Sequence, residues 1–355
     1  MKRTYLDWNA TAPLRPEAKA AMGAAMEVVG NPSSVHAEGR AAKALMEKSR
    51  AQVAAAIGCK PDEVIFTSGA TEAASVLSRV PPTHDVLVDP TAHDCLWAHF
   101  RTGGGAESGH TLAWGLANNE TGIIAEPQRL AEGGWAYGAR RADWLLLDIV
   151  QVVGKVPFSF AWSGADMAVV SAHKFGGPKG MGALIVREGL DITPLSLGGG
   201  QEMSRRAGTE NLIGIAGMGA AVEAAARDLA NGVWDEVAEL RNILESELSA
   251  EAKETISVGN GSPRLPNTLC LIAPGWKGET QVMAMDLAGF AVSAGSACSS
   301  GKVRASRVLT AMGYDQALAG QAIRVSIGPG VTKDDVLRFA QVWTAAYAKA
   351  RARAA

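Results

Sequence analysis

Short apolar runs recur along the first half of the chain, each bounded by Gly, Pro, Asp or Asn. They cover residues 63–67, 86–88, 111–116, 144–147, 167–171 and 183–186. Apolar runs of this length, bounded by such turn-forming residues, are typical of buried strands. Ala-rich stretches with a helical spacing of apolar residues occupy 18–29 and 41–57. This alternation predicts an α/β fold, an open sheet with helices on both faces.

A helical stretch rich in Ala, Met, Leu and Glu runs from Leu212 to about Ala250 and could link two domains. With 355 residues, 47% of them hydrophobic, the chain can bury a large core and divide in this way. We expect a large domain of residues 15–245. Residues 1–14 and 246–355 are expected to form a smaller α+β domain.

The composition indicates an ordinary soluble protein. With a net charge of -2, the protein has no general electrostatic attraction to nucleic acid or to an anionic membrane surface. No segment of the sequence is apolar over the length that a membrane span needs. The start of the chain does not resemble a signal peptide, so we expect a cytosolic protein.

Four cysteines, Cys59, Cys95, Cys270 and Cys298, stand far apart in the sequence, which argues against a disulfide framework or a zinc site. Six scattered histidines also give no metal-ligand cluster. The last helix has a plausible capping box in Thr332 and Asp335.

Small and hydroxyl residues separate a predicted strand from a helix start in the segment FTSGATEA, where Ser68, Gly69, Ala70 and Thr71 lie. Ligands of open α/β sheets collect beyond the carboxyl ends of strands, and N–H groups with a hydroxyl there suit a phosphate. Taken alone, a plain turn with Ser68 or Thr71 capping the helix is the more common explanation of such a segment. By itself, the segment therefore decides nothing.

A carboxylate, Asp148, ends the apolar run LLLD, and Gln151 follows three residues later. A buried carboxylate needs a partner, and the protonated nitrogen of pyridoxal phosphate (PLP) is one that a fixed carboxylate stabilises. An Asp that caps the next helix is the alternative.

A lysine, Lys174, follows Ser171 and His173 after another apolar run and opens a Gly-rich segment. In an apolar pocket an amine loses its proton readily and can attack an aldehyde to form a Schiff base. Most lysines are solvated surface charges. Here, however, Asp148 and Thr71 stand at two further strand ends, and together these residues predict one cradle for PLP.

Nine segments resemble, in order, the class V aminotransferase-like PLP enzymes of fold type I, and among them the cysteine desulfurases related to nitrogen-fixation and iron-sulfur assembly enzymes. They are YLDWNATAP, NPSSVHAEGR, FTSGATEA, NNETG, LLLDIVQVVGK, SAHKFGGPKG, GGGQEMSRRAGTEN, SAGSACSSGK and IRVSIGPG. The resemblance covers most of the chain. It implies the PLP-dependent transferase fold type I, with a mostly parallel sheet in the large domain.

The resemblance also implies roles in binding PLP. Lys174 would form the Schiff base and take the α-proton of the substrate, Asp148 would face the pyridine nitrogen, and Gln151 the ring hydroxyl. The phosphate would be bound by Thr71, Ser171 and His173, next to Ala70, and by Thr209 of a neighbouring subunit in a homodimer. His93 would stack on the ring and take part in proton transfer, although a lone histidine is more often a structural hydrogen-bonding group.

The resemblance further assigns substrate and sulfur chemistry. Asn119 and Arg324 would bind the carboxylate of L-cysteine, for which a guanidinium is well shaped. Cys298, in a small, polar and Gly-rich segment, would take the sulfur as a persulfide, leave L-alanine, and pass the sulfur to a scaffold or carrier protein. Two alternatives stay open. One is another PLP enzyme, such as a selenocysteine lyase, an amino-acid lyase or a transaminase, and the other is a degenerate homologue without catalysis.

The chain departs from this pattern between His93 and Asn119, where close relatives have a longer segment. The space suffices for one short helix, a Gly-rich turn and one strand. We therefore expect one strand-helix unit of the large domain to be reduced.

Overall fold

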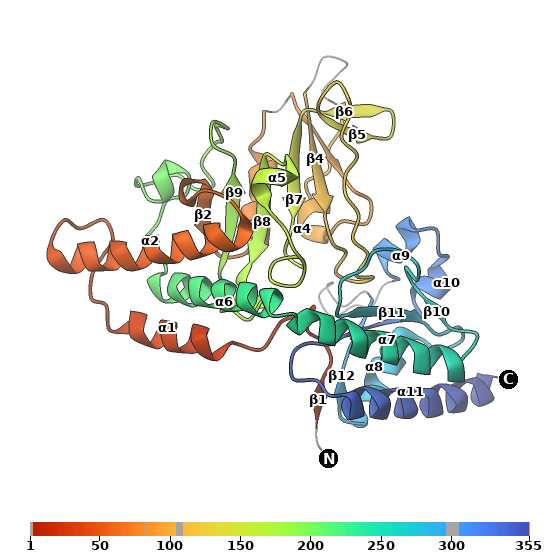
Figure 1. The fold of residues 1–355 in the computed structure, drawn as a ribbon. Helices are drawn as coiled ribbons and strands as arrows, with labels where there is room; N and C mark the ends of the chain where they lie inside the picture. The colour runs from red at the N-terminus through yellow and green to blue at the C-terminus, as the bar shows by residue number, and fades with distance from the viewer. Residues whose placement is uncertain (1–2, 82, 104–108, 296–304, 355) are drawn as a thin grey trace. The chain divides into compact units, whose positions relative to one another are not determined.

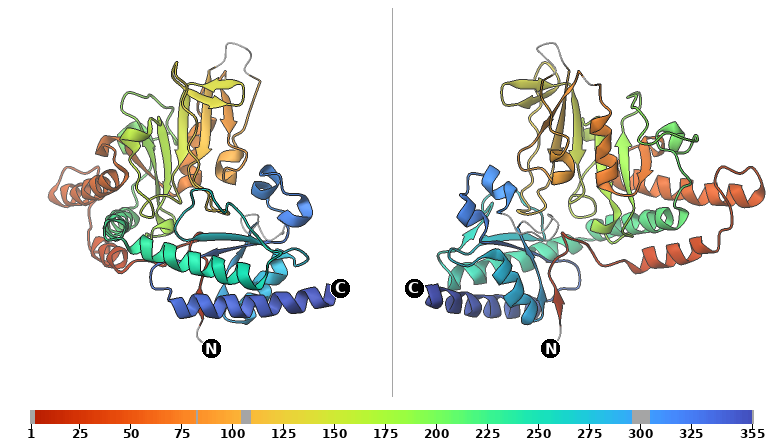
Figure 2. Two further views of the ribbon diagram at one scale, coloured as in Figure 1. Left: turned by 45° about the vertical axis from the view of Figure 1, so that its right-hand side comes forward. Right: turned by 180° about the vertical axis from the view of Figure 1, so that it is seen from behind.

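The computed structural model describes residues 3–81, 83–103, 109–295 and 305–354. The predicted sulfur-accepting residue, Cys298, lies outside the described residues. The chain divides into two compact units (Figures 1 and 2). Unit 1 combines Met1–Thr11, Ala117–Ile124 and Asn231–Ala355, and unit 2 combines Ala12–Leu116 and Ala125–Ala230.

Unit 2 contains a six-stranded sheet in the order β2-β9-β8-β7-β4-β3. Its strands are β2 (Val64–Thr67), β3 (Asp85–Val88), β4 (His110–Gly115), β7 (Trp144–Asp148), β8 (Met167–Ser171) and β9 (Gly182–Val186). The pairs β3–β4, β4–β7 and β7–β8 are parallel, while β9 runs antiparallel to β2 and β8. The apolar runs are thus strands, and the predicted α/β class with a mostly parallel sheet is confirmed.

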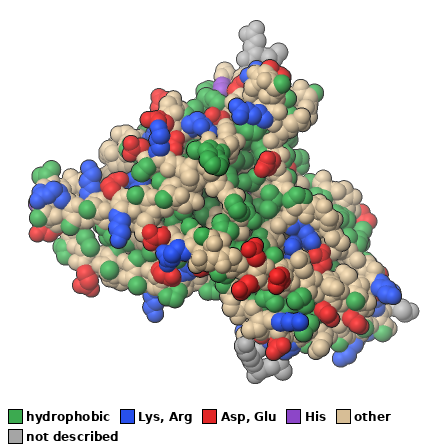
Figure 3. Space-filling model, viewed as in Figure 1, with side chains coloured by type: hydrophobic (Ala, Val, Ile, Leu, Met, Phe, Trp, Pro, Cys, Tyr) green, Lys and Arg blue, Asp and Glu red, His purple; other side chains and the backbone are tan. Residues whose placement is uncertain are grey.

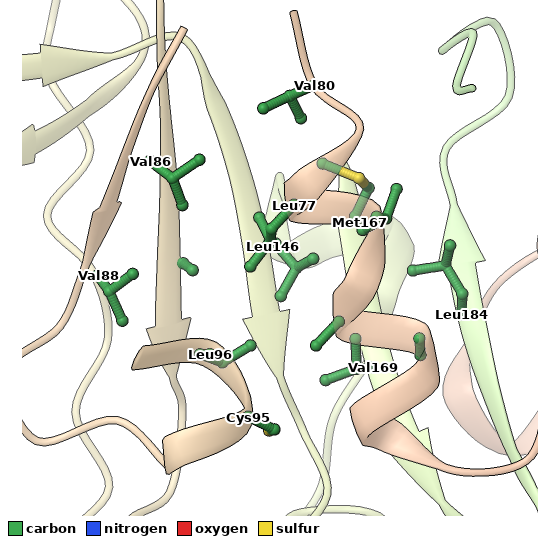
Figure 4. Packing of buried hydrophobic residues seen from close by; sticks show 14 of the residues in the cluster. Leu77, Val80, Val86, Val88, Cys95, Leu96, Leu146, Met167, Val169 and Leu184 are labelled. Carbon is green, nitrogen blue, oxygen red and sulfur yellow. The ribbon is translucent and has the colours of Figure 1, made fainter. Parts of the chain in front are cut away.

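One face of this sheet packs against α3 (Ala70–Ala74), η2 (Ser75–Ser78) and α4 (Asp94–Trp97). Leu77 of η2 and Leu96 of α4 lie over Leu146 and Val169 of the strands (Figure 4). Removing each such side chain from water contributes about 1.5–3 kcal/mol. The helix α6 (Leu212–Ala230) packs against both α1 (Pro16–Met26) and α2 (Ala37–Ile57), and α2 also contacts β2. Short segments η1 (Pro61–Glu63), α5 (Phe160–Ser163), η3 (Ala172–Lys174) and η4 (Glu202–Ser204) complete the unit.

A hairpin, rather than a helix, lies between the parallel strands β4 and β7. It consists of β5 (Trp135–Tyr137) and β6 (Arg140–Ala142), paired antiparallel, and Gly138 turns the chain with a φ of 58°. Parallel strands are usually joined by a crossover helix. Between β3 and β4 the only helix in the described residues is α4, so the expected reduction of this part of the fold to one short helix is confirmed.

Unit 1 contains a four-stranded sheet in the order β10-β11-β14-β13 and a separate parallel pair, β1–β12. The strands are β1 (Thr4–Tyr5), β10 (Ile256–Ser257), β11 (Thr268–Ile272), β12 (Phe290–Ala291), β13 (Ser293–Ala294) and β14 (Ala322–Ser326). The helices are α7 (Val233–Glu251), α8 (Gly278–Leu287), α9 (Arg307–Ala311), α10 (Gln316–Ala319) and α11 (Lys333–Ala354). The predicted capping box of the last helix is confirmed, because the N–H of Asp335 donates to Thr332 Oγ1 (3.2 Å) and the N–H of Thr332 to Asp335 Oδ2 (3.3 Å).

The stretch from 212 to 250, predicted as one long helical segment, is two helices. The break falls at Asn231 and Gly232, where Gly232 has a φ of 76° and precedes α7 in the left-handed conformation. Residues other than glycine adopt this conformation only at a cost. The domain boundary expected at 245/246 lies inside α7, a helix that belongs as a whole to unit 1.

Charged side chains of both signs are interspersed over the face shown in Figure 3, in keeping with the net charge of -2. A polyanion would meet no large single-sign patch on this face. In the part of the chain that the structure describes, no helix is long and apolar enough to cross a membrane.

A buried ion pair fixes the segment η4 in unit 2. Arg50 of α2 donates from both Nη atoms to the two carboxylate oxygens of Glu202 (2.9 Å each), and the N–H of Phe66 donates to Glu202 Oε2 (2.8 Å). Glu202, Met203 and Ser204 have φ values of 47°, 56° and 64°. Non-glycine residues keep this left-handed backbone conformation only where surrounding contacts hold them in it. The ion pair and the bond from β2 provide that restraint.

Replacement of Glu202 by Ala should lower the free energy of unfolding by about 3–5 kcal/mol, because it leaves the Arg50 guanidinium buried and uncompensated. Urea unfolding followed by circular dichroism measures the change. The matched control is Glu188→Ala, since Glu188 pairs with Lys60 at the surface, and that substitution should leave the midpoint unchanged. An unchanged midpoint for Glu202→Ala would contradict the role given to the pair.

Candidate active site

The parallel register brings three strand ends of unit 2 to one edge of the sheet. Asp148, the last residue of β7, is level with Gly115 of β4 and Val169 of β8. Ser171 ends β8, and Lys174 ends the η3 turn that follows it directly. The carboxylate and the amine therefore both project from the edge at which open α/β sheets bind ligands.

The surroundings of Asp148 join three predicted residues in one site. Burial raises the pKa of the Asp148 carboxyl group above its ordinary value. Two effects oppose this shift and lower the pKa: the N–H of Val150, which donates to Oδ1 (2.9 Å), and the nearby charges of His93 and Lys174. These two charges act on the carboxylate only because they are near it. The structure thus brings together Asp148, His93 and Lys174.

The imidazole of His93 forms the N-cap of α4. Its Nδ1 accepts from the N–H of Cys95 (3.1 Å), so the proton of the neutral ring lies on Nε2. The loop passes close to the end of β4, since a Cβ on Gly115 would lie 3.8 Å from Cα of Ala92. Sequence reasoning gave Cys95 no part in the site; its position two residues after His93, at the start of a helix, is the signal that could have indicated the contact.

The predicted phosphate-binding residues come from two neighbouring turns. Gly69, with a φ of 157°, precedes Ala70 and Thr71 at the start of α3. A Cβ on Gly69 would lie 3.9 Å from Ser171 Oγ, so this turn and the end of β8 are adjacent. His173 follows Ser171 after one residue.

The electrostatic environment of His173 suits an anion. Burial, and after it the charges of Lys174, Lys179 and Lys155, together lower the pKa of His173 to about 4. Three cations close enough to disfavour a fourth positive charge would favour a phosphate.

The amide of Gln151 is oriented by a lysine. Lys155 Nζ donates to Gln151 Oε1 (2.7 Å), and both residues are buried. Because the amide oxygen faces Lys155, the NH2 group faces the other way, as a donor to a ring hydroxyl requires. Sequence reasoning missed Lys155, although it stands four residues after Gln151.

The side chain of Thr209 is exposed and lines a cavity of about 210 Å³ in unit 2. Ser68, Arg206 and Glu210 line the same cavity. Thr209 therefore lies beside the β2–α3 turn without being buried in the group around Asp148.

The two predicted carboxylate-binding residues meet in unit 1. Arg324 of β14 is buried, and its Nη1 donates to the backbone carbonyl of Asn119 (3.0 Å), while its Nη2 donates to Asp7 Oδ1 (2.7 Å). Sequence reasoning did not single out Asp7, which lies within the segment YLDWNATAP. Two described residues close to the segment 296–304 also form hydrogen bonds in unit 1. The N–H of Gly295 donates to the carbonyl of Ala322 (3.3 Å), and Ser306 Oγ donates to Glu120 Oε2.

The donor set of unit 2 fits PLP. The raised pKa of Asp148 means that a cation beside its carboxylate would lower the free energy of the ionised form, and a protonated pyridine ring is such a cation. Lys174 supplies an amine for the aldehyde, and the lysines around His173 favour the phosphate. Among the described residues, no three His, Cys, Asp or Glu side chains form a group that could hold a metal ion.

The depressed pKa of His173 predicts a pH dependence of stability. Unfolding restores the ordinary pKa of 6.5, so between pH 6.5 and about 4 the unfolded chain binds more protons than the folded chain. This contribution to stability is complete above pH 6.5 and is lost as the pH falls towards 4. His173→Asn in PLP-free protein should flatten the decline of unfolding free energy in this window, measured by urea unfolding at several pH values. His36→Asn, at an exposed position, is the control, and equal slopes for wild type and His173→Asn would contradict the prediction.

A family of known proteins matches most of the chain. The family described as Aminotransferase class-V matches residues 4–91 and 107–339. His93 lies in the gap between the two matched ranges, in the segment that is short in this chain.

Among curated proteins, a cysteine desulfurase of Cereibacter sphaeroides is 38% identical over 96% of this chain and 95% of its own length. The cysteine desulfurase IscS of Dictyoglomus turgidum is 36% identical over 95% of this chain and 92% of its own length. A solved structure described as a NifS-like protein superposes with a TM-score of 0.84 at 29% identity, covering 98% of this chain and all of that one (100%). The chain therefore belongs to the class V aminotransferase family and, within it, to the group of the cysteine desulfurases.

Proposed function

We propose that this protein is a PLP-dependent cysteine desulfurase, which removes the sulfur of L-cysteine and leaves L-alanine. The observation that carries the proposal is the site shared by Asp148, His93 and Lys174 in a chain whose relatives bear that name. A carboxylate, an imidazole and an amine at one sheet edge supply a partner for the ring nitrogen, a proton-bearing ring and an attachment point for an aldehyde.

Bound PLP supplies an electron sink for the negative charge left when the substrate loses its α-proton. Lys174 would hold the aldehyde through Nζ. Once the amine of the substrate has displaced it from the aldehyde, the freed Nζ would accept the α-proton. Asp148 would keep the ring nitrogen protonated, and Gln151 would donate its amide N–H to the ring hydroxyl. His93 presents Nε2–H, because the N–H of Cys95 occupies its Nδ1.

The phosphate would be bound by Ser171, His173 and Thr71, next to the backbone of Ala70. Thr209 would reach the phosphate of a second copy of the chain, which its exposure permits, and the working form would then be a homodimer. The three lysines around His173 support an anion here.

The substrate carboxylate is bound by Arg324, which the Asn119 carbonyl orients. The thiolate of Cys298 would attack the substrate sulfur, and the carbon-sulfur bond would break. The sulfur would stay on Cys298 as a persulfide, while the electron pair of the broken bond would stay with the β-carbon, which takes up a proton and becomes the methyl group of L-alanine. A scaffold or carrier protein, as in iron-sulfur cluster assembly, then takes the sulfur.

Lys174→Ala should abolish the visible absorbance of the bound aldehyde together with turnover, because no amine remains to hold it. Cys298→Ala should keep the absorbance but lose the cysteine-dependent formation of alanine and sulfide. Absorbance spectra and amino-acid analysis measure the two effects. Cys59→Ala is the control, since burial raises the pKa of that thiol to about 12 and leaves it a poor nucleophile.

Failure of the cofactor-loaded wild type to form alanine from cysteine would reject the proposed function. Full activity in Cys298→Ala would instead indicate another PLP enzyme of the family, such as a selenocysteine lyase, an amino-acid lyase or a transaminase.

Asp148→Asn should lower kcat by about 10²–10³-fold, because the amide supplies no charge to keep the ring nitrogen protonated. Steady-state kinetics with L-cysteine, at equal occupancy by PLP, measures the effect. Asp166→Asn is the matched control: Asp166 is also an aspartate of this sheet, but it receives the N–H of Leu145 (2.8 Å) at the opposite end of β7. A kcat for Asp148→Asn within a factor of three of wild type would overturn the role given to this carboxylate.

A further inference from the structure

The guanidinium of Arg324 is fixed by two acceptors inside unit 1. Its Nη2 donates to Asp7 Oδ1 at 2.7 Å, and its Nη1 donates to the Asn119 carbonyl at 3.0 Å. Only 4% of the Arg324 side chain and 17% of the Asp7 side chain are exposed. At this burial the pair is weakly screened by water, so it restrains the plane of the guanidinium strongly.

The carboxylate of Asp7 is itself held on both oxygens. Oδ1 accepts from Arg324, and Oδ2 accepts from Ser293 Oγ at 2.7 Å. The strands provide the alignment, since Ser293 of β13 is level with Arg324 of β14 and Asp7 forms a parallel bridge to Ser326. Asp7 therefore has little freedom to turn away from the guanidinium.

The Nε atom of Arg324 differs from the two Nη atoms. Within residues 3–81, 83–103, 109–295 and 305–354, Nε of Arg324 is buried and has no hydrogen-bond acceptor. A buried donor of a charged group is costly to leave unsatisfied, and a ligand carboxylate would remove that cost.

We propose that Asp7 is a positioning residue, which holds the guanidinium so that its Nε–H edge receives the α-carboxylate of the amino acid. The inference rests on the proposed function, in which Arg324 binds that carboxylate. Asp7 thereby sets the preference for amines that carry a carboxylate over amines that do not.

The test compares two substitutions in the PLP-loaded protein. Asp7→Asn and Asp7→Ala remove the same charge, but only Asn keeps an acceptor oxygen opposite Nη2. Two ligands are titrated by the change in visible absorbance: L-alanine, and ethylamine, which is L-alanine without its carboxylate. We expect L-alanine to bind at least tenfold more weakly to Asp7→Ala than to Asp7→Asn. Ethylamine should bind both variants equally, within a factor of two.

Equal L-alanine affinities in the two variants would overturn the inference. A parallel loss of ethylamine binding would also overturn it, because a merely structural role affects both ligands. Should Asp7→Ala fail to fold, Ser293→Ala decides: we expect several-fold weaker L-alanine binding than in wild type with ethylamine unchanged, and unchanged L-alanine binding would reject the role. Asp286→Asn, which removes the carboxylate of an exposed pair with Arg3, is the control and should match wild type.

The result is separable from the proposed function. If the wild type forms no alanine from cysteine, the desulfurase proposal fails. The L-alanine and ethylamine titrations still decide whether Asp7 positions Arg324, since neither involves the transfer of sulfur.

Discussion

The parallel alignment of β4, β7 and β8 is the constraint on which the candidate site depends. It sets Gly115, Asp148 and Val169 at one level, so that the chain leaves each strand at the same edge of the sheet. A shift of one residue in β7 would turn the Asp148 side chain to the other face. The buried, apolar side chains of these strands oppose such a shift, and in this way the packing of the core fixes the position of a carboxylate.

Desolvation and local charge then act together at that edge. Burial raises the pKa of Asp148 and lowers the pKa of His173, which in both cases is the direction that disfavours the ionised form. A ligand with a cationic ring and an anionic arm would offset both effects at once. The two parts of such a ligand would lie at neighbouring strand ends, and Lys174 directly follows His173 in the chain.

The strands of unit 2 and the residues at which they end could be predicted from the sequence, because both depend on local patterns. An apolar run that stops at Asp148 or Ser171 indicates a strand and its end without further context. The break at Gly232 was harder to predict, since the helical spacing continues on both sides and a single glycine is tolerated in many helices.

Other features could not be predicted because they join distant parts of the chain. Arg50 contacts Glu202, and Asp7 contacts Arg324, only once the strands have aligned. No sequence spacing predicts either pair. Resemblance to a family gave the role of Arg324 but not the carboxylate that holds it. The proton position on His93 likewise became visible only with the N–H of Cys95 in place.

The hairpin between β4 and β7 has a consequence for the order of folding. A parallel pair forms only when a long connecting segment closes, and the entropy lost on closure grows with the length of that segment. The strands β5 and β6 are close in sequence, so they can pair early and shorten the remaining connection before β4 meets β7. A crossover helix would shorten the connection as well. Unlike a helix, however, β5 and β6 have backbone groups that could also pair with the edges of β4 and β7. The tight turn of the hairpin at Gly138 therefore favours pairing within the hairpin over pairing with the unfinished sheet.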